Sequence, residues 1–165
     1  MKKILIVDDE AELCEMLKRC LDKTGLYEVR ATSIPQEVVS LCHQYHPDLI
    51  LLDIVMPHLK GTDLIRELKE HPVTRDILIV VTSGLGEMVY HVKKDQWKWE
   101  PNRDIVHKRG EVIKEHYAEE AAKAYGVDDF IAKPFSRETL LTVINDVFAR
   151  AGKLTETNPP NNDPQ

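Results

Sequence analysis

Five short apolar runs divide the chain, at residues 3–7, 27–31, 48–52, 77–81 and 129–132. Four of them are continuous rather than alternating, which is typical of strands that helices cover on both faces. The run at 27–31 reads Tyr-Glu-Val-Arg-Ala and alternates, which is typical of a strand at the edge of a sheet. The pattern therefore predicts five strands, of which the second lies at an edge.

Helical patterns, with apolar residues every three or four positions, separate these runs. One stripe runs from Leu13 to Leu21 and ends at Gly25, and Pro35 is a favourable first-turn residue for the next helix. A third pattern follows the third strand, and the last helix begins behind Ser136, a good capping residue. Because strand and helix alternate five times, we predict an α/β fold with a doubly wound, five-stranded parallel sheet.

Charged side chains directly follow three of the five predicted strands, and hydroxyl side chains follow the fourth strand. The second strand ends in Ala31 and Thr32, with nothing charged. In chain order the residues at the other four strand ends are Asp8, Asp9 and Glu10 after the first strand, Asp53 after the third, Thr82 and Ser83 after the fourth, and Lys133 after the fifth. In a sheet of order 2-1-3-4-5, the four strands that lead into these residues are neighbours. Their carboxyl ends form the edge at which doubly wound sheets bind ligands.

The residue types at this edge suit one kind of chemistry. Asp8, Asp9 and Asp53 would make an oxygen-rich pocket for a hard divalent cation such as Mg²⁺, which offsets the repulsion between carboxylates. Lys133 supplies a point positive charge and Thr82 a hydroxyl donor, and the combination is typical of phosphoryl transfer. Taken one at a time, the same residues also fit helix caps, turn residues and a surface lysine.

Four sequence blocks carry a resemblance to a known family. They read VDDE at 7–10, LLDIVMPHLKG at 51–61, VTS at 81–83 and FIAKPF at 130–135. Together, and in this order, they resemble the signature blocks of the response-regulator receiver domain of two-component signalling, over roughly residues 1–150. Each block alone is weak evidence, but four in the right order at strand ends are strong evidence. The resemblance implies a flavodoxin-like receiver fold.

The resemblance also implies roles for the acidic residues. Asp53 matches the phosphoacceptor, whose carboxylate attacks phosphorus in line and becomes an aspartyl phosphate. Asp9 matches a direct Mg²⁺ ligand, and Asp8 matches the carboxylate that positions metal-bound water. The backbone carbonyl of Val55, two residues past the acceptor, matches a further metal ligand.

The remaining matched residues contact the phosphoryl group or respond to it. Thr82 matches the hydroxyl that hydrogen-bonds the phosphoryl group, and Lys133 matches the ammonium that pairs with it. Phe130 matches an aromatic residue whose rotamer follows the position of Thr82. The resemblance implies a cis peptide bond between Lys133 and Pro134.

The leading hypothesis is a receiver that accepts a phosphoryl group from a histidine kinase or phosphotransfer protein and signals by protein contact. It would be no enzyme beyond its own phosphorylation and dephosphorylation. An alternative is a degenerate receiver that acts as a phosphorylation-independent binding module. A haloacid-dehalogenase-like phosphohydrolase with an aspartate nucleophile is a further alternative, but neither DDEAE nor DIVMP fits the DxDx[TV] pattern of that family.

One stretch departs from the family. A strand-helix-strand crossover needs roughly 20 to 25 residues, whereas Thr82 and Lys133 lie 51 positions apart. We place the insertion at about residues 85–116; it contains both tryptophans, Trp97 and Trp99. Its conformation stays open, since residues 89–99 could form a hairpin and residues 104–126 one long helix.

The insertion also gives a candidate contact surface. It carries an excess of Lys and Arg in a chain whose net charge is −6. Trp and Arg are over-represented at binding hot spots. We expect a downstream partner, or a second copy, to bind the insertion and the face formed by the fourth helix, fifth strand and last helix of the fold.

Composition limits the other classes of function. With 42% hydrophobic and 30% charged residues, the chain is expected to form one receiver domain over residues 1–150, followed by a disordered tail over 151–165 and no output domain. The negative net charge disfavours nucleic-acid binding. No apolar run approaches the roughly 18 residues of a membrane span, and we expect a cytoplasmic protein.

Overall fold

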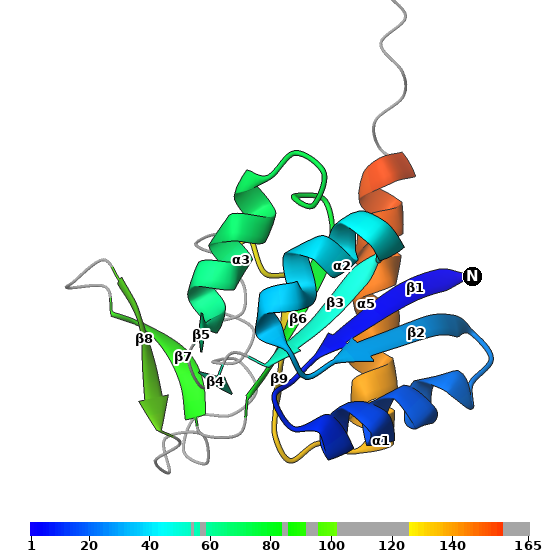
Figure 1. Ribbon diagram of the computed structural model, residues 1–165, viewed down its shortest axis with the longest axis horizontal. Coiled ribbons are helices and arrows are strands. Elements are labelled where there is room, and N and C mark those ends of the chain that lie inside the picture. The colour runs from blue at the N-terminus through cyan, green and yellow to red at the C-terminus, as the bar shows by residue number, and fades with distance from the viewer. Residues whose placement is uncertain (54, 57–58, 84–85, 92–95, 102–125, 157–165) are drawn as a thin grey trace, which may run out of the picture.

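The computed structural model of the protein describes residues 1–53, 55–56, 59–83, 86–91, 96–101 and 126–156 (Figure 1). Its central feature is a parallel sheet of five strands in the order β2-β1-β3-β6-β9. These strands are β1 (Lys2–Val7), β2 (Tyr27–Thr32), β3 (Leu49–Asp53), β6 (Leu78–Ser83) and β9 (Asp129–Ala132). They are the five predicted strands in the predicted order 2-1-3-4-5, so the fold prediction is confirmed.

Helices cover both faces of this sheet (Figure 1). They are α1 (Ala11–Asp22), α2 (Val38–Tyr45), α3 (Gly61–Glu70) and α5 (Arg137–Glu156), and the short 3-10 turn η1 (Pro35–Glu37) precedes α2. Leu5 and Val7 pack with α2 and α3, whereas Ile4 and Ile6 pack with α1 and α5. Continuous apolar strands are needed because successive side chains point to opposite, equally buried faces.

The ends of the helices follow local chemistry. After α1 the chain turns at Gly25, whose φ of +67° is in the left-handed region that favours glycine. At the start of α5 the backbone N–H of Thr139 donates to Ser136 Oγ at 3.0 Å, so the predicted cap is present. Pro35 opens η1 rather than α2 itself.

The last helix is longer than the sequence suggested. We expected a disordered tail from residue 151, but α5 continues to Glu156. The prediction was wrong for residues 151–156 because Ala151, Lys153 and Leu154 are good helix formers, and one glycine in a helix costs only about 1 kcal/mol. Residues 157–165 lie outside the described part of the chain.

Two small antiparallel pairs lie apart from the main sheet. The first joins β4 (Val55–Met56) to β5 (Leu59–Lys60) directly after β3. The second, within the insertion, joins β7 (Gly86–His91) to β8 (Gln96–Pro101). The hairpin alternative is therefore confirmed, while the helix considered for 104–126 falls almost entirely outside the described residues. None of the described helices is long and apolar enough to cross a membrane.

Candidate functional site

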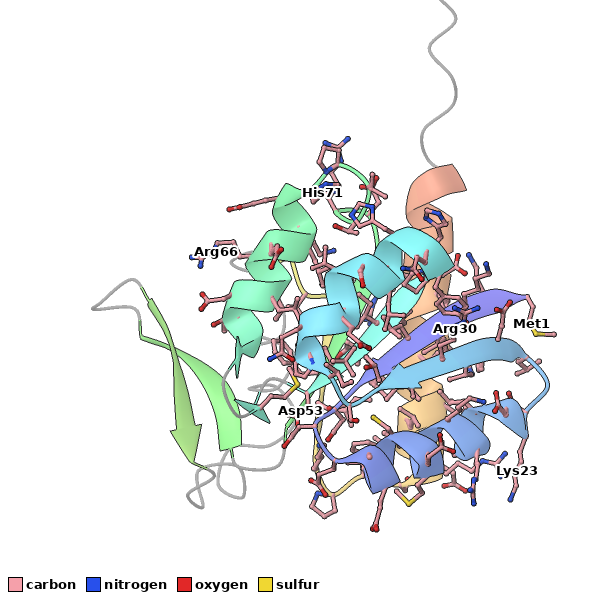
Figure 2. All side chains as sticks on the ribbon, viewed as in Figure 1. Met1, Lys23, Arg30, Asp53, Arg66 and His71 are labelled. Carbon is pink, nitrogen blue, oxygen red and sulfur yellow. The ribbon has the colours of Figure 1, made fainter. Side chains whose placement is uncertain are left out.

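The carboxyl ends of β1, β3, β6 and β9 meet at one edge of the sheet. Val7 lies beside Leu52, so Asp8 follows β1 where Asp53 ends β3. Asp53 in turn lies beside Thr82, and Thr82 beside Ile131. The strand register thus brings the predicted residues together, and Figure 2 shows Asp53 at this edge.

Three carboxylates converge there. Asp8, Asp9 and Asp53 each offer an oxygen atom, and these atoms all lie within 4.8 Å of one another. Asp8 is 2% exposed and Asp53 5% exposed, while Asp9 lies at the surface. Burying like charges is costly unless cations compensate them. The arrangement therefore requires positive charge, as the acidic run after β1 had indicated.

Lys133 provides part of that charge. Its Nζ donates hydrogen bonds to Asp8 Oδ2 at 2.6 Å and to Asp53 Oδ2 at 3.0 Å, and its side chain is 15% exposed. Burial alone would lower the pKa of Lys133, but the hydrogen bonds to the two carboxylates outweigh burial, and the pKa is raised. The lysine is thus held as a cation that contacts both buried carboxylates. The Lys133–Pro134 bond is cis, as the resemblance implies.

The loop that carries Asp8 is held by backbone and thiol contacts. Asp8 Oδ1 accepts the N–H of Glu10 at 2.9 Å, and the N–H of Asp8 donates to the carbonyl of Thr32 at 3.3 Å. The buried Cys14 Sγ lies 3.3 Å from the carbonyl oxygen of Asp8. Burial, with the nearby Asp8 charge, raises the pKa of Cys14 to about 11, so the thiol keeps its proton and donates.

No contact of Cys14 was predicted from the sequence. The sequence offers one signal for the contact, because Cys14 lies within the first turn and a half of the helix that follows the acidic pair. A spacing of six residues does not by itself show that a thiol reaches back to a carbonyl.

Three further predicted residues occupy suitable places, although their roles stay predictions. Thr82 is buried and directly beside Asp53 in the sheet. Phe130 is half-buried and packs against the core on the α2 and α3 face. Val55 opens β4, two residues past Asp53.

The donor set fits a hard divalent cation. Three carboxylates and one lysine give the cluster a negative formal charge, and the converging ligand atoms are all oxygen. Mg²⁺ prefers one or two carboxylates together with water and phosphate oxygens. Asp8, Asp9 and Asp53 are the described residues that could hold it.

A parallel sheet of this order, with an acidic cluster and a lysine at its carboxyl edge, defines a receiver domain. The chain matches the family model described as "Response regulator receiver domain" over residues 4–96. The chain belongs to this family.

Solved structures agree with the fold. The response regulator receiver domain protein from Clostridium thermocellum superposes with a TM-score of 0.65 at 23% identity, over 93% of this chain and 99% of that one. The chemotaxis protein CheY4 of Vibrio cholerae has a TM-score of 0.64 at 22% identity, over 89% and 98% of the two chains. At such identities the likeness concerns the fold alone.

Curated relatives are longer proteins. The phosphate regulon transcriptional regulatory protein PhoB of Pseudomonas aeruginosa is 32% identical over 151 residues, which are 92% of this chain and 53% of PhoB. The probable transcriptional regulator ycf27 of Porphyra purpurea is 29% identical over 154 residues, 93% of this chain and 50% of ycf27. The chain spans about half the length of the curated relatives it matches.

Proposed function

We propose that this receiver accepts a phosphoryl group on Asp53 in a Mg²⁺-dependent reaction, with a histidine kinase or phosphotransfer protein as donor. The observation that carries the proposal is the position of Asp53 at the end of the central strand β3. The buried carboxylate of Asp8 lies on the β1 side of it and Thr82 on the β6 side, and the ammonium of Lys133 contacts both Asp8 and Asp53.

The transfer assigns a task to each group. A carboxylate oxygen of Asp53 attacks phosphorus, forming an oxygen–phosphorus bond while the phosphorus–nitrogen bond to the donor histidine breaks. Lys133 is close enough to exchange its bond with Asp53 for one with a phosphoryl oxygen, and Thr82 can donate its hydroxyl to another. Bound Mg²⁺ would supply positive charge to the carboxylates and the phosphoryl oxygens.

Asp8 and Asp9 would hold the metal in different ways. Asp8 is already fixed by Lys133 and by the N–H of Glu10, so it suits a role in orienting metal-bound water. Asp9 lies at the surface and within reach of the other two carboxylates, which suits direct coordination. The backbone carbonyl of Val55 would complete the protein's ligands.

The output of the phosphorylated protein would be protein contact rather than turnover of another substrate, and the protein would act in the cytoplasm. The contact surface would include the insertion and the face formed by β9 and α5. β7 begins three residues after Ser83, the last residue of β6, so a change at Thr82 would be transmitted to the hairpin along a short stretch of chain. Phe130, beside Val81 in the sheet, would change rotamer with it.

Intact-mass spectrometry tests the reaction. Incubated with a small-molecule phosphodonor and Mg²⁺, the wild-type protein should gain the mass of one phosphoryl group. Asp53→Asn should gain none, and neither should the wild type in the presence of a chelator. Asp63→Asn is the matched control, because Asp63 is an exposed aspartate on α3 outside the cluster. Wild-type protein that stays unmodified, also with a competent kinase, would instead support a degenerate receiver.

A further inference from the structure

No residue of the hairpin formed by β7 and β8 takes part in the proposed phosphoryl transfer. The two strands make a two-stranded sheet of their own, and within the described residues neither pairs with a third strand. Figure 1 shows the hairpin to one side of the five-stranded sheet. A two-stranded hairpin alone is marginally stable in water, so further strand pairing would stabilise it.

The pairing register sorts the residues of the hairpin onto two faces, because directly opposed residues share a face. Met88 lies opposite Trp99, and Tyr90 opposite Trp97. These four positions make one apolar face, here called the aromatic face. On the other face Glu87 lies opposite Glu100, Val89 opposite Lys98 and His91 opposite Gln96, so every position of that face except Val89 is polar. The hairpin is therefore amphipathic along its whole length.

The charges along β8 favour a second copy of the same strand as its partner. If two β8 strands pair antiparallel about a two-fold axis at Trp99, Lys98 of each copy lies opposite Glu100 of the other. The same register places Trp99 opposite Trp99. Within β8, axes at Lys98 or at Glu100 place like charges opposite each other. An axis at Trp97 places Lys98 opposite Gln96 and leaves Glu100 facing a position outside β8.

The other strand of the hairpin offers no such match. At neutral pH, Glu87 is the one charged position of β7, apart from any charge on His91. Two antiparallel β7 strands could therefore not place Lys or Arg opposite Glu. Opposite charges on facing strands stabilise the pair, and like charges directly opposite destabilise it.

We propose that β8 pairs with β8 of a second copy of this chain, in the register centred on Trp99. The product is a four-stranded antiparallel sheet in the order β7-β8-β8-β7, with one continuous aromatic face. The interface is isologous, since each copy contributes the same strand. This inference concerns the hairpin alone and does not depend on phosphoryl transfer at Asp53, so either can fail without the other.

A charge exchange tests the register. Sedimentation equilibrium of the wild type, from low to several hundred micromolar, should show a reversible dimer. Lys98→Glu and Glu100→Lys should each weaken dimerisation about tenfold, because the two-fold axis repeats every lost pair. The double variant restores opposite charges across the axis and should regain wild-type dimerisation. Lys23→Glu, on the side of the molecule away from the hairpin in Figure 2, is the control and should change nothing.

A crosslink provides a second measurement that does not depend on charge. Trp99→Cys, in a Cys20→Ser background with Cys14 and Cys42 buried, should form a disulfide-linked dimer on mild oxidation. Glu87→Cys should not, because β7 lies at the outer edges of the four-stranded sheet. A wild type that is monomeric throughout, a double variant that stays monomeric, or a dimer that neither single charge variant weakens would overturn the proposal.

Discussion

Removal of the Lys133 ammonium should reveal how strongly the acidic cluster depends on it. In Lys133→Met, Asp8 and Asp53 lose their shared hydrogen-bond donor while remaining almost completely buried. Removing one partner of a buried ion pair costs about 3 to 5 kcal/mol. Because Lys133 is itself 15% exposed and water reaches Asp9, we expect the low end, about 3 kcal/mol.

Thermal unfolding measures this loss. For a domain of this size, about 3 kcal/mol lowers Tm by roughly 6 to 12 °C. The loss should be largest in EDTA and smaller in excess Mg²⁺, since a bound cation replaces part of the missing charge. Asp53→Asn in the Lys133→Met background should recover part of the stability, because it removes one of the repelling carboxylates.

The control is Lys18→Met, which removes a lysine from the exposed pair with Asp22 on α1. Exposed pairs contribute about 0 to 1 kcal/mol, so this variant should unfold close to the wild type. If Lys133→Met unfolds like Lys18→Met in EDTA, Lys133 does not compensate the buried carboxylates, and the electrostatic account of the site is wrong.

Three further predictions concern the same site and the strand that leads to it. Asp9→Ala should lose most of its Mg²⁺ affinity in a calorimetric titration while its circular dichroism stays unchanged; unchanged affinity would contradict the assignment of Asp9 as a direct ligand. Gly126→Ala should lower the free energy of unfolding by about 1 to 2 kcal/mol, because φ is +67° and an added Cβ would lie 3.2 Å from Lys69 Cγ; a urea titration with a wild-type midpoint would refute this. The pKa of Lys133 is raised in the folded state. Its contribution to stability is therefore complete below its unfolded pKa and is lost as pH rises through the folded pKa. The stability difference between the wild type and Lys133→Met should shrink in strongly alkaline solution, and a difference that grows there would contradict the direction of the shift.

Much of the site could be predicted because parallel strands end at a common edge. Once the apolar runs were assigned as strands, the positions of Asp8, Asp53, Thr82 and Lys133 followed from strand order. The sequence could not show that Lys133 divides its hydrogen bonds between two carboxylates. Those distances depend on how β9 is placed against β6, and 125 residues separate Lys133 from Asp8.

The incorrect or open predictions had local causes. The tail was expected to begin at residue 151 because few residues beyond it are apolar, yet α5 continues to Glu156, since helix propensity extends a helix without burial. The conformation of the hairpin segment could not be decided from the sequence, because few of its residues alternate and Lys and Gln fit a helix as well as a strand. Strand pairing between β7 and β8 decides it.

The most direct measurement is the location of the phosphoryl group within the chain. Reductive trapping of the phosphorylated protein with borohydride, followed by peptide mapping, identifies the aspartate that carried the acyl phosphate. The account predicts modification of Asp53 alone, dependent on Mg²⁺ and strongly reduced in Lys133→Met. Modification of Asp8 or Asp9 with Asp53 unmodified, or modification that proceeds equally in EDTA, would contradict it.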